Sequence, residues 1–206
     1  PVTTARFANV AFSNGSLPDG WIQRLMKQQP LAAPNDVKRY FVSPQESGQI
    51  CMLACILGNN GEIFFPKLGE DQMITFSSFC EKFVKTAGYE EKQCSSDSEA
   101  RKFAAQRTEN SKEYPVVYFS SDTTGEKGFE EFYILGEKIN MERFQSLGVI
   151  EETTHRPMDE VESFFTDLEA IFHKEEFTKA EIVAALKSFL PNFEHEEKGK
   201  NLDQKM

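Results

Sequence analysis

A strand that runs directly into a helix is predicted by the segment Val37-Lys38-Arg39-Tyr40-Phe41-Val42-Ser43-Pro44-Gln45-Glu46. Its aromatic and β-branched residues favour a half-buried strand. Ser43 then suits the helix N-cap, Pro44 suits the first turn, and Glu46 completes a capping box with Ser43. We expect the helix over residues 45–57, where apolar side chains recur at helical spacing, and a Gly-Asn-Asn-Gly sequence ends it.

Arg39 lies on this strand, just before the rigid turn into the helix. A guanidinium held at such a place can bind a phosphate or a carboxylate through two parallel hydrogen bonds. An ordinary surface arginine is the alternative, and the segment alone leaves both open.

Composition and charge restrict the classes of function. The chain has 206 residues, enough for one large domain or a domain with a smaller appendage. Its formal net charge is −10; residues 151–206 hold 14 acidic and 7 basic side chains, hence −7, which leaves −3 for residues 1–150. We therefore expect no nucleic-acid partner, because a phosphate backbone needs a basic face.

The sequence also predicts no membrane partner and a cytoplasmic location. It has no apolar run of about 18 residues, and we expect no signal peptide. Its cysteines form no Cys-x-x-Cys pair, and no histidine is placed to join them around a metal. We expect buried, reduced thiols and no metal site.

The remaining segments alternate between strand and helix patterns, which predicts an α/β fold. Strands are expected at residues 5–12, 62–66, 90–94 and 114–119. Helices are expected at 21–27, from 75 or 77 to Gly88, at 98–106, at 158–174 and from 178 to 190. The polar loop at 13–16 follows a buried strand, which is where open α/β sheets bind ligands.

Three segments together resemble the extended short-chain dehydrogenase/reductases that act on nucleotide sugars. Arg6-Phe7-Ala8-Asn9-Val10 with Gly15-Ser16-Leu17-Pro18 resembles a strand and loop of that family. Lys38-Arg39-Tyr40-Phe41-Val42-Ser43 resembles its phosphate-contacting arginine strand. Thr124-Gly125-Glu126-Lys127 with Glu130-Glu131 resembles the Gly-Glu-Lys…Glu-Glu element of the polysaccharide-biosynthesis branch, which contains UDP-N-acetylglucosamine 4,6-dehydratases and related epimerases.

The resemblance covers about residues 4–150 and implies a sugar-nucleotide site. In the family, the residues that match Asn9 and Arg39 bind near the pyrophosphate of a UDP-sugar, and the residue that matches Glu126 lies near the nucleoside. The implied substrate-binding residues are Asn9, Ser16, Leu17, Arg39, Glu126 and Lys127. Structural roles remain open for some, since Asn9 can cap its own turn and Glu126 can pair with Lys127. Many relatives have Arg-Pro where this chain has Thr123-Thr124, so we expect one phosphate contact to be either missing or supplied elsewhere.

Two motifs of the family are absent from these 206 residues: the Gly-rich cofactor loop and a Tyr-x-x-x-Lys pair. The resemblance therefore implies the carboxyl-terminal, substrate-binding part of such an enzyme over residues 1–150, followed by an acidic helical extension over 151–206. Its expected fold comprises the last strands of a Rossmann-type sheet, a small α/β lobe and the helical tail.

Two functions follow as hypotheses. In the first, the parent enzyme is an NAD- or NADP-dependent UDP-sugar dehydratase or epimerase, and this chain alone binds no cofactor and catalyses nothing. In the second, the chain is a non-catalytic assembly module whose acidic tail docks a partner. Exposed sheet edges and apolar helix faces would make the isolated chain a homo-oligomer.

Overall fold

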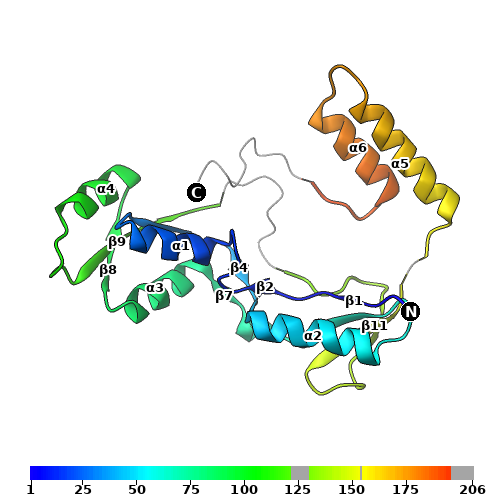
Figure 1. Cartoon of the computed structure of the whole chain (residues 1–206), viewed down its shortest axis with the longest axis horizontal. Coiled ribbons are helices and arrows are strands. Elements are labelled where there is room, and N and C mark those ends of the chain that lie inside the picture. The colour runs from blue at the N-terminus through cyan, green and yellow to red at the C-terminus, as the bar shows by residue number, and fades with distance from the viewer. Residues whose placement is uncertain (122–129, 154, 196–206) are drawn as a thin grey trace. The chain divides into compact units, whose positions relative to one another are not determined.

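The structure, a computed structural model, describes residues 1–121, 130–153 and 155–195. They form two compact units, one of residues 1–121 with 130–153 and the other of residues 155–195. The first unit is the mixed α/β fold with parallel strands that the sequence predicts (Figure 1). None of the described helices is both long enough and apolar enough to cross a membrane.

A three-stranded parallel sheet forms one half of the first unit. Its strands, in spatial order, are β3 (Leu31–Pro34), β9 (Glu113–Phe119) and β8 (Glu90–Cys94). Because side chains alternate along a strand, Val116 faces the core beneath α1 (Leu17–Met26) and α3 (Phe76–Thr86). Val117 packs on the other face against α4 (Asp97–Gln106).

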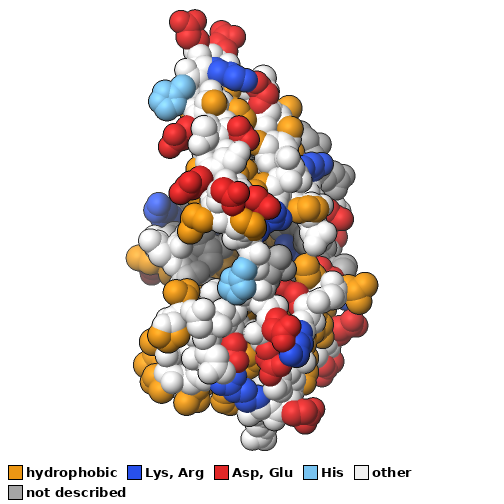
Figure 2. Space-filling view, turned by 90° about the vertical axis from the view of Figure 1, so that its right-hand side faces the viewer, with side chains coloured by type: hydrophobic (Ala, Val, Ile, Leu, Met, Phe, Trp, Pro, Cys, Tyr) orange, Lys and Arg blue, Asp and Glu red, His pale blue; other side chains and the backbone are white. Residues whose placement is uncertain are grey.

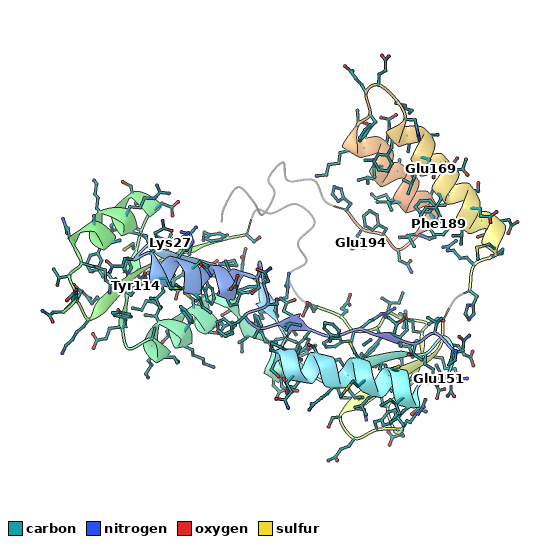
Figure 3. The ribbon with its side chains drawn as sticks, in the orientation of Figure 1. Lys27, Tyr114, Glu151, Glu169, Phe189 and Glu194 are labelled. Atoms are coloured by element: carbon teal, nitrogen blue, oxygen red, sulfur yellow. The ribbon has the colours of Figure 1, made fainter. Side chains whose placement is uncertain are left out.

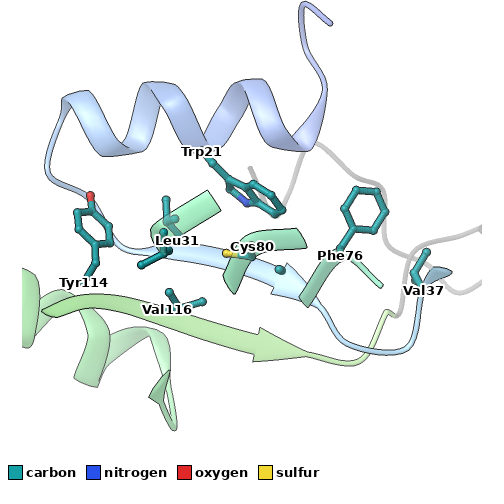
Figure 4. Close-up of a cluster of buried hydrophobic side chains, with 9 residues drawn as sticks. Trp21, Leu31, Val37, Phe76, Cys80, Tyr114 and Val116 are labelled. Carbon is teal, nitrogen blue, oxygen red and sulfur yellow. The ribbon is translucent and has the colours of Figure 1, made fainter. Parts of the chain in front are cut away.

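Trp21 of α1 is the centre of the larger core (Figure 4). Its side chain is fully buried, and its Nε1 donates a hydrogen bond to the Ala32 carbonyl at 2.9 Å, so burial leaves no indole donor unpaired. The polar group of buried Tyr114 is also paired: at the other end of α1 its hydroxyl donates to the Gln29 carbonyl at 2.8 Å.

A second sheet carries the remaining long strands of this unit. Its order is β1 (Thr4–Ala5), β6 (Ile63–Pro66), β11 (Leu147–Glu152) and β10 (Lys138–Asn140), with β1 and β6 parallel and the other pairs antiparallel. Gly148 lies opposite Phe65, where an added Cβ would meet the phenyl ring at 2.3 Å. A side chain there would displace the ring.

Two expected strands are each divided between sheets. Residues 5–12 give β1 and a separate β2 (Asn9–Val10), and residues 37–42 give β4 (Lys38–Arg39) and β5 (Phe41–Val42). β2 pairs with β5 in parallel, while β4 pairs with β7 (Ile74–Thr75) in antiparallel orientation. A hydrophobic pattern cannot show that a chain changes its strand partner, so the sequence analysis was wrong on this point.

The helix α2 (Pro44–Leu57) begins as predicted. The Glu46 amide donates to Ser43 Oγ at 3.1 Å, and the Ser43 amide donates to Glu46 Oε2 at 2.6 Å, which completes the capping box. These hydrogen bonds lower the pKa of Glu46.

One face of α2 is apolar and exposed. Ile50 and Ala54 pack on the second sheet, but Met52 and Ile56 are 59% and 75% exposed. The expectation of buried thiols fails here, because Cys51 and Cys55 are exposed and only Cys80 and Cys94 are buried. A helix that is apolar on all sides normally lies in a protein interior.

The second unit is a hairpin of α5 (Met158–Phe172) and α6 (Lys179–Phe189). Phe189 of α6 stacks on Phe164 of α5, with ring centroids 4.2 Å apart (Figure 3). Neither helix contains a fully buried residue, because two helices alone cannot enclose a core.

Charges on the visible face of the molecule are mixed. Lys and Arg side chains lie scattered among Asp and Glu side chains and form no basic patch on that face (Figure 2). Binding to a nucleic-acid backbone requires such a patch.

A buried ion pair fixes the turn between α2 and β6. Glu62 is only 5% exposed, and both of its carboxylate oxygens lie 2.8 Å from Arg143 Nη1. The Asn59 amide and side chain also donate to this carboxylate, at 2.7 and 2.9 Å. Burial alone would raise the pKa of Glu62, but the hydrogen bonds from Asn59 and the Arg143 charge outweigh it and hold the pKa low.

Arg143→Ala should lower the free energy of unfolding at neutral pH by about 3–5 kcal/mol, because it leaves a buried carboxylate without its cation. Urea unfolding followed by the fluorescence of Trp21, the single tryptophan, measures the change in the first unit. Because the pair depresses the folded-state pKa of Glu62, its contribution is present at neutral pH and disappears as pH falls through that pKa. The difference between wild type and variant should therefore shrink in acid.

Lys138→Ala serves as the control, because it breaks an exposed ion pair with Glu152 in the neighbouring hairpin. Its effect should be much smaller, since exposed pairs are screened by solvent. Equal losses for the two variants would contradict the role given to Glu62 and Arg143.

Candidate functional site

The chain that leaves β3 brings polar side chains beyond the carboxyl ends of two parallel strands. The Asn35 amide donates to the Phe119 carbonyl at 3.0 Å, and the Asp36 carboxylate accepts from the Ser121 amide at 2.8 and 3.0 Å. Arg39 follows three residues after Asp36. This edge is the usual ligand position in α/β folds with parallel strands.

The backbone of Tyr40 is held on both sides. The Asn9 amide donates to the Tyr40 carbonyl at 3.2 Å, and the Tyr40 amide donates to the Glu130 carboxylate. The Tyr40 side chain is buried, with its ring centroid 5.2 Å from that of Phe132. Segments around residues 9, 40 and 130 therefore meet at the backbone amide and carbonyl of Tyr40, which together form the Tyr40 peptide.

Arg39 immediately precedes this fixed peptide. It is half-buried, and its Nη1 donates to the Lys38 carbonyl at 2.8 Å, while its backbone pairs with Ile74. The two expected site residues Asn9 and Arg39 are thus brought together, Asn9 through its backbone and Arg39 through its position next to Tyr40.

Glu130 belongs to the Gly-Glu-Lys…Glu-Glu motif, but nothing in that motif assigned it a role in ligand binding. Its Oε2 atom is buried and accepts no hydrogen bond in the described part of the chain. Burial raises the pKa of Glu130, although the Arg39 charge and the Tyr40 amide act in the opposite direction. The buried Oε2 atom of this half-buried acid and the influence of the Arg39 charge on its pKa are the signals of its role, and they are visible only in three dimensions.

Other acidic groups surround the Tyr40 hydroxyl. Burial raises the pKa of Tyr40, and Glu70, Asp71 and Glu130 raise it further. The phenol therefore stays neutral at physiological pH. The positive charge of Arg39 acts on Glu130 in this negative environment and lowers its pKa.

Ser16 and Leu17 occupy structural positions. Ser16 is the N-cap of α1, where its Oγ accepts from the Asp19 amide at 3.3 Å, and Leu17 packs against the core around Trp21. A ligand role for either residue stays a prediction. Glu126 and Lys127, the other two expected site residues, lie outside the described residues.

The described residues do not fit the pyrophosphate of a dinucleotide cofactor. The strand-to-helix turn before α1 holds a single glycine, Gly15, whose amide donates to Asp19 Oδ2 at 3.3 Å. The three-glycine turn that cradles a dinucleotide is missing from the sequence. Among the described residues, no three His, Cys, Asp or Glu side chains are grouped so that they could hold a metal ion.

Comparisons with known proteins identify the family. A family model described as "Polysaccharide biosynthesis protein" matches residues 1–152. Among solved structures, the chain is similar to Pen from Bacillus thuringiensis, with 18% sequence identity and a TM-score of 0.48. That match covers 75% of this chain and 40% of the Pen chain, so the chain spans less than half of Pen. A comparison with curated proteins gave no match.

The family model covers most of the chain, including the Arg6–Val10, Lys38–Ser43 and Gly125–Lys127 motifs. The resemblance seen in the sequence is therefore confirmed, and the chain belongs to the polysaccharide biosynthesis protein family of short-chain dehydrogenase/reductase type.

Proposed function

We propose that this chain is the sugar-nucleotide-binding part of an NAD- or NADP-dependent UDP-N-acetyl-sugar 4,6-dehydratase or epimerase. Such an enzyme would act in surface-polysaccharide or nonulosonic-acid biosynthesis. The observation that carries the proposal is the position of Arg39, which lies beside the doubly held Tyr40 peptide on the segment that resembles the family's phosphate-contacting strand.

Arg39 is assigned to the pyrophosphate of the UDP-sugar. A guanidinium matches phosphate oxygens in geometry and charge, and the fixed Tyr40 peptide limits the freedom of the backbone that carries it. Asn9 lies beside the same peptide and supplies amide donors. Glu126 and Lys127 are assigned to the nucleoside end, as the family motif implies, and Ser16 and Leu17 to the loop beside it.

Binding of the pyrophosphate should depend strongly on Arg39. Thr123-Thr124 stands where many relatives have Arg-Pro, so one cation of the family site is missing here. Glu70, Asp71 and Glu130 add negative charge to the surroundings of Tyr40. With fewer cations to share the ligand charge, loss of one has a larger effect.

The exposed α2 face supports a position at the end of a Rossmann-type sheet. β1 is an edge strand among the described residues, and α2 packs on β1 and β6 while Met52 and Ile56 remain exposed. An apolar helix face beside an open parallel edge is suited to receive further α/β structure. We infer that the cofactor is held there by other residues, and that this chain alone is inactive. All four cysteines are free, which suits a reducing, cytoplasmic location.

A second candidate function is a non-catalytic assembly module. The observation that favours it is the outer face of α5, where the exposed side chains Met158, Phe165 and Phe172 recur every seven residues. A seven-residue apolar repeat is typical of helices that pack against another helix. In this alternative the nucleotide site would be vestigial.

UDP-N-acetylglucosamine should raise the thermal midpoint of the wild-type chain, because a ligand that binds only the folded state stabilises it. Arg39→Ala should weaken binding by about 10- to 100-fold, because a charge-assisted contact to phosphate is lost. Thermal unfolding and isothermal titration calorimetry measure both effects, with UDP as the ligand that retains the pyrophosphate and NAD as the cofactor control.

Arg101→Ala is the matched control, since it removes an exposed arginine from α4. It should leave binding unchanged. If the folded wild-type chain binds neither UDP-N-acetylglucosamine nor UDP, the sugar-nucleotide proposal is wrong and the assembly module becomes the better candidate.

The isolated chain should self-associate through the exposed face of α2, and Ile56→Glu should shift it toward monomer by placing a charge in the apolar contact. Sedimentation velocity at several concentrations measures the effect. Gln45→Glu adds the same charge at an exposed position near the start of the helix and should not change the association. A wild-type chain that stays monomeric at high concentration would contradict the predicted self-association through the exposed face of α2.

A further inference from the structure

Glu130 has one carboxylate oxygen that the fold leaves unused. The Tyr40 amide donates to the carboxylate, whereas Oε2 is buried and accepts no hydrogen bond in the described residues. A buried polar atom without a partner normally costs stability, so an atom of this kind requires an explanation. A ligand that supplies the missing donor is one explanation.

The neighbouring charges restrict what that donor can be. The Arg39 charge lowers the pKa of Glu130, while the negative charges of Glu70 and Asp71 raise the pKa of Tyr40. The pair of Arg39 and Glu130 therefore presents a cation next to an acceptor.

A ligand that fits such a pair carries an anion and a hydrogen-bond donor close together. A sugar nucleotide has this chemistry, since hydroxyl groups of its ribose and its hexose both lie a few bonds from the pyrophosphate. A simple anion would instead be repelled by Glu130. A lone metal cation is disfavoured, because the described acids form no group of three that could hold one.

We propose that Glu130 binds the sugar nucleotide directly, with Oε2 accepting a hydrogen bond from a ligand hydroxyl while Arg39 binds the adjacent phosphate. This inference rests on the proposed sugar-nucleotide function and adds a residue to it. The Tyr40 amide holds the other oxygen, which orients Oε2, and the same peptide positions Arg39. One peptide thus sets the spacing between the two ligand-binding groups.

The test compares Glu130→Gln with the wild-type chain by isothermal titration calorimetry. Glutamine keeps the shape and can still accept from the Tyr40 amide through Oε1, which places its NH₂ group where Oε2 was. Electrostatics alone predicts tighter binding, because the substitution removes a negative charge near a diphosphate. The proposed hydrogen bond predicts the opposite, a loss of about tenfold or more in affinity.

Two ligands distinguish the source of the hydroxyl. A loss with both UDP and UDP-N-acetylglucosamine assigns the hydrogen bond to ribose, and a loss with UDP-N-acetylglucosamine alone assigns it to the hexose. Glu130→Asp keeps the charge but draws the carboxylate back by one methylene, and it should weaken the same ligand. Thermal unfolding of each variant without ligand shows that it is folded.

Glu70→Gln is the control, because Glu70 is exposed and also acts on Tyr40. The Glu70→Gln variant should bind both ligands as tightly as the wild-type chain or slightly more tightly. Unchanged or tighter binding by folded Glu130→Gln, in a chain whose binding still requires Arg39, would overturn the role of Glu130 and leave the proposed function intact. No binding of either ligand by the wild-type chain would overturn both.

Discussion

The peptide of Tyr40 joins three segments that lie far apart in the sequence. Its carbonyl accepts from the Asn9 amide, and its amide donates to the Glu130 carboxylate. The Tyr40 ring closes the small core that contains Ala8 and Val42. Because the chain changes its strand partner at this residue, from β7 before it to β2 after it, the peptide cannot move without disturbing both strand pairs. Arg39, the residue on which the proposed chemistry depends, takes its position from this constraint.

The sequence predicts those parts of the fold whose signals are local. The N-cap of α2 was identified from Ser43, Pro44 and Glu46 alone, because each residue acts within one helical turn. The strand β8 has the expected bounds, and α3 begins at the Thr75 cap. Long-range pairing was not predictable in the same way. The strands β3, β10 and β11 were not predicted. β3 pairs with β9 and β11 pairs with β6, and both partners are distant in the chain.

The candidate site was predictable to a similar extent. Asn9 and Arg39 were named from motifs. In the structure the Asn9 amide donates to the Tyr40 carbonyl, and Arg39 is the residue before Tyr40. Ser16 was also named, but in the structure its hydroxyl caps α1, a role that any serine before a helix can take. Glu130 lacked a sequence signal because acids are common on surfaces. Its buried Oε2 atom and the effect of the Arg39 charge on its pKa distinguish it from Glu131, which is exposed.

Amide hydrogen exchange with and without UDP-N-acetylglucosamine tests most directly whether the Tyr40 peptide organises a sugar-nucleotide site. A ligand that binds at Arg39 and Glu130 stabilises the folded arrangement of these segments and slows their local opening. The amides of Asn9, Ala11 and Tyr40 should therefore exchange more slowly with ligand, while those of α4 and of the α5–α6 hairpin should not change. Unchanged exchange at Asn9 and Tyr40 under saturating ligand, or protection confined to other segments, would contradict the assignment of the site to this peptide.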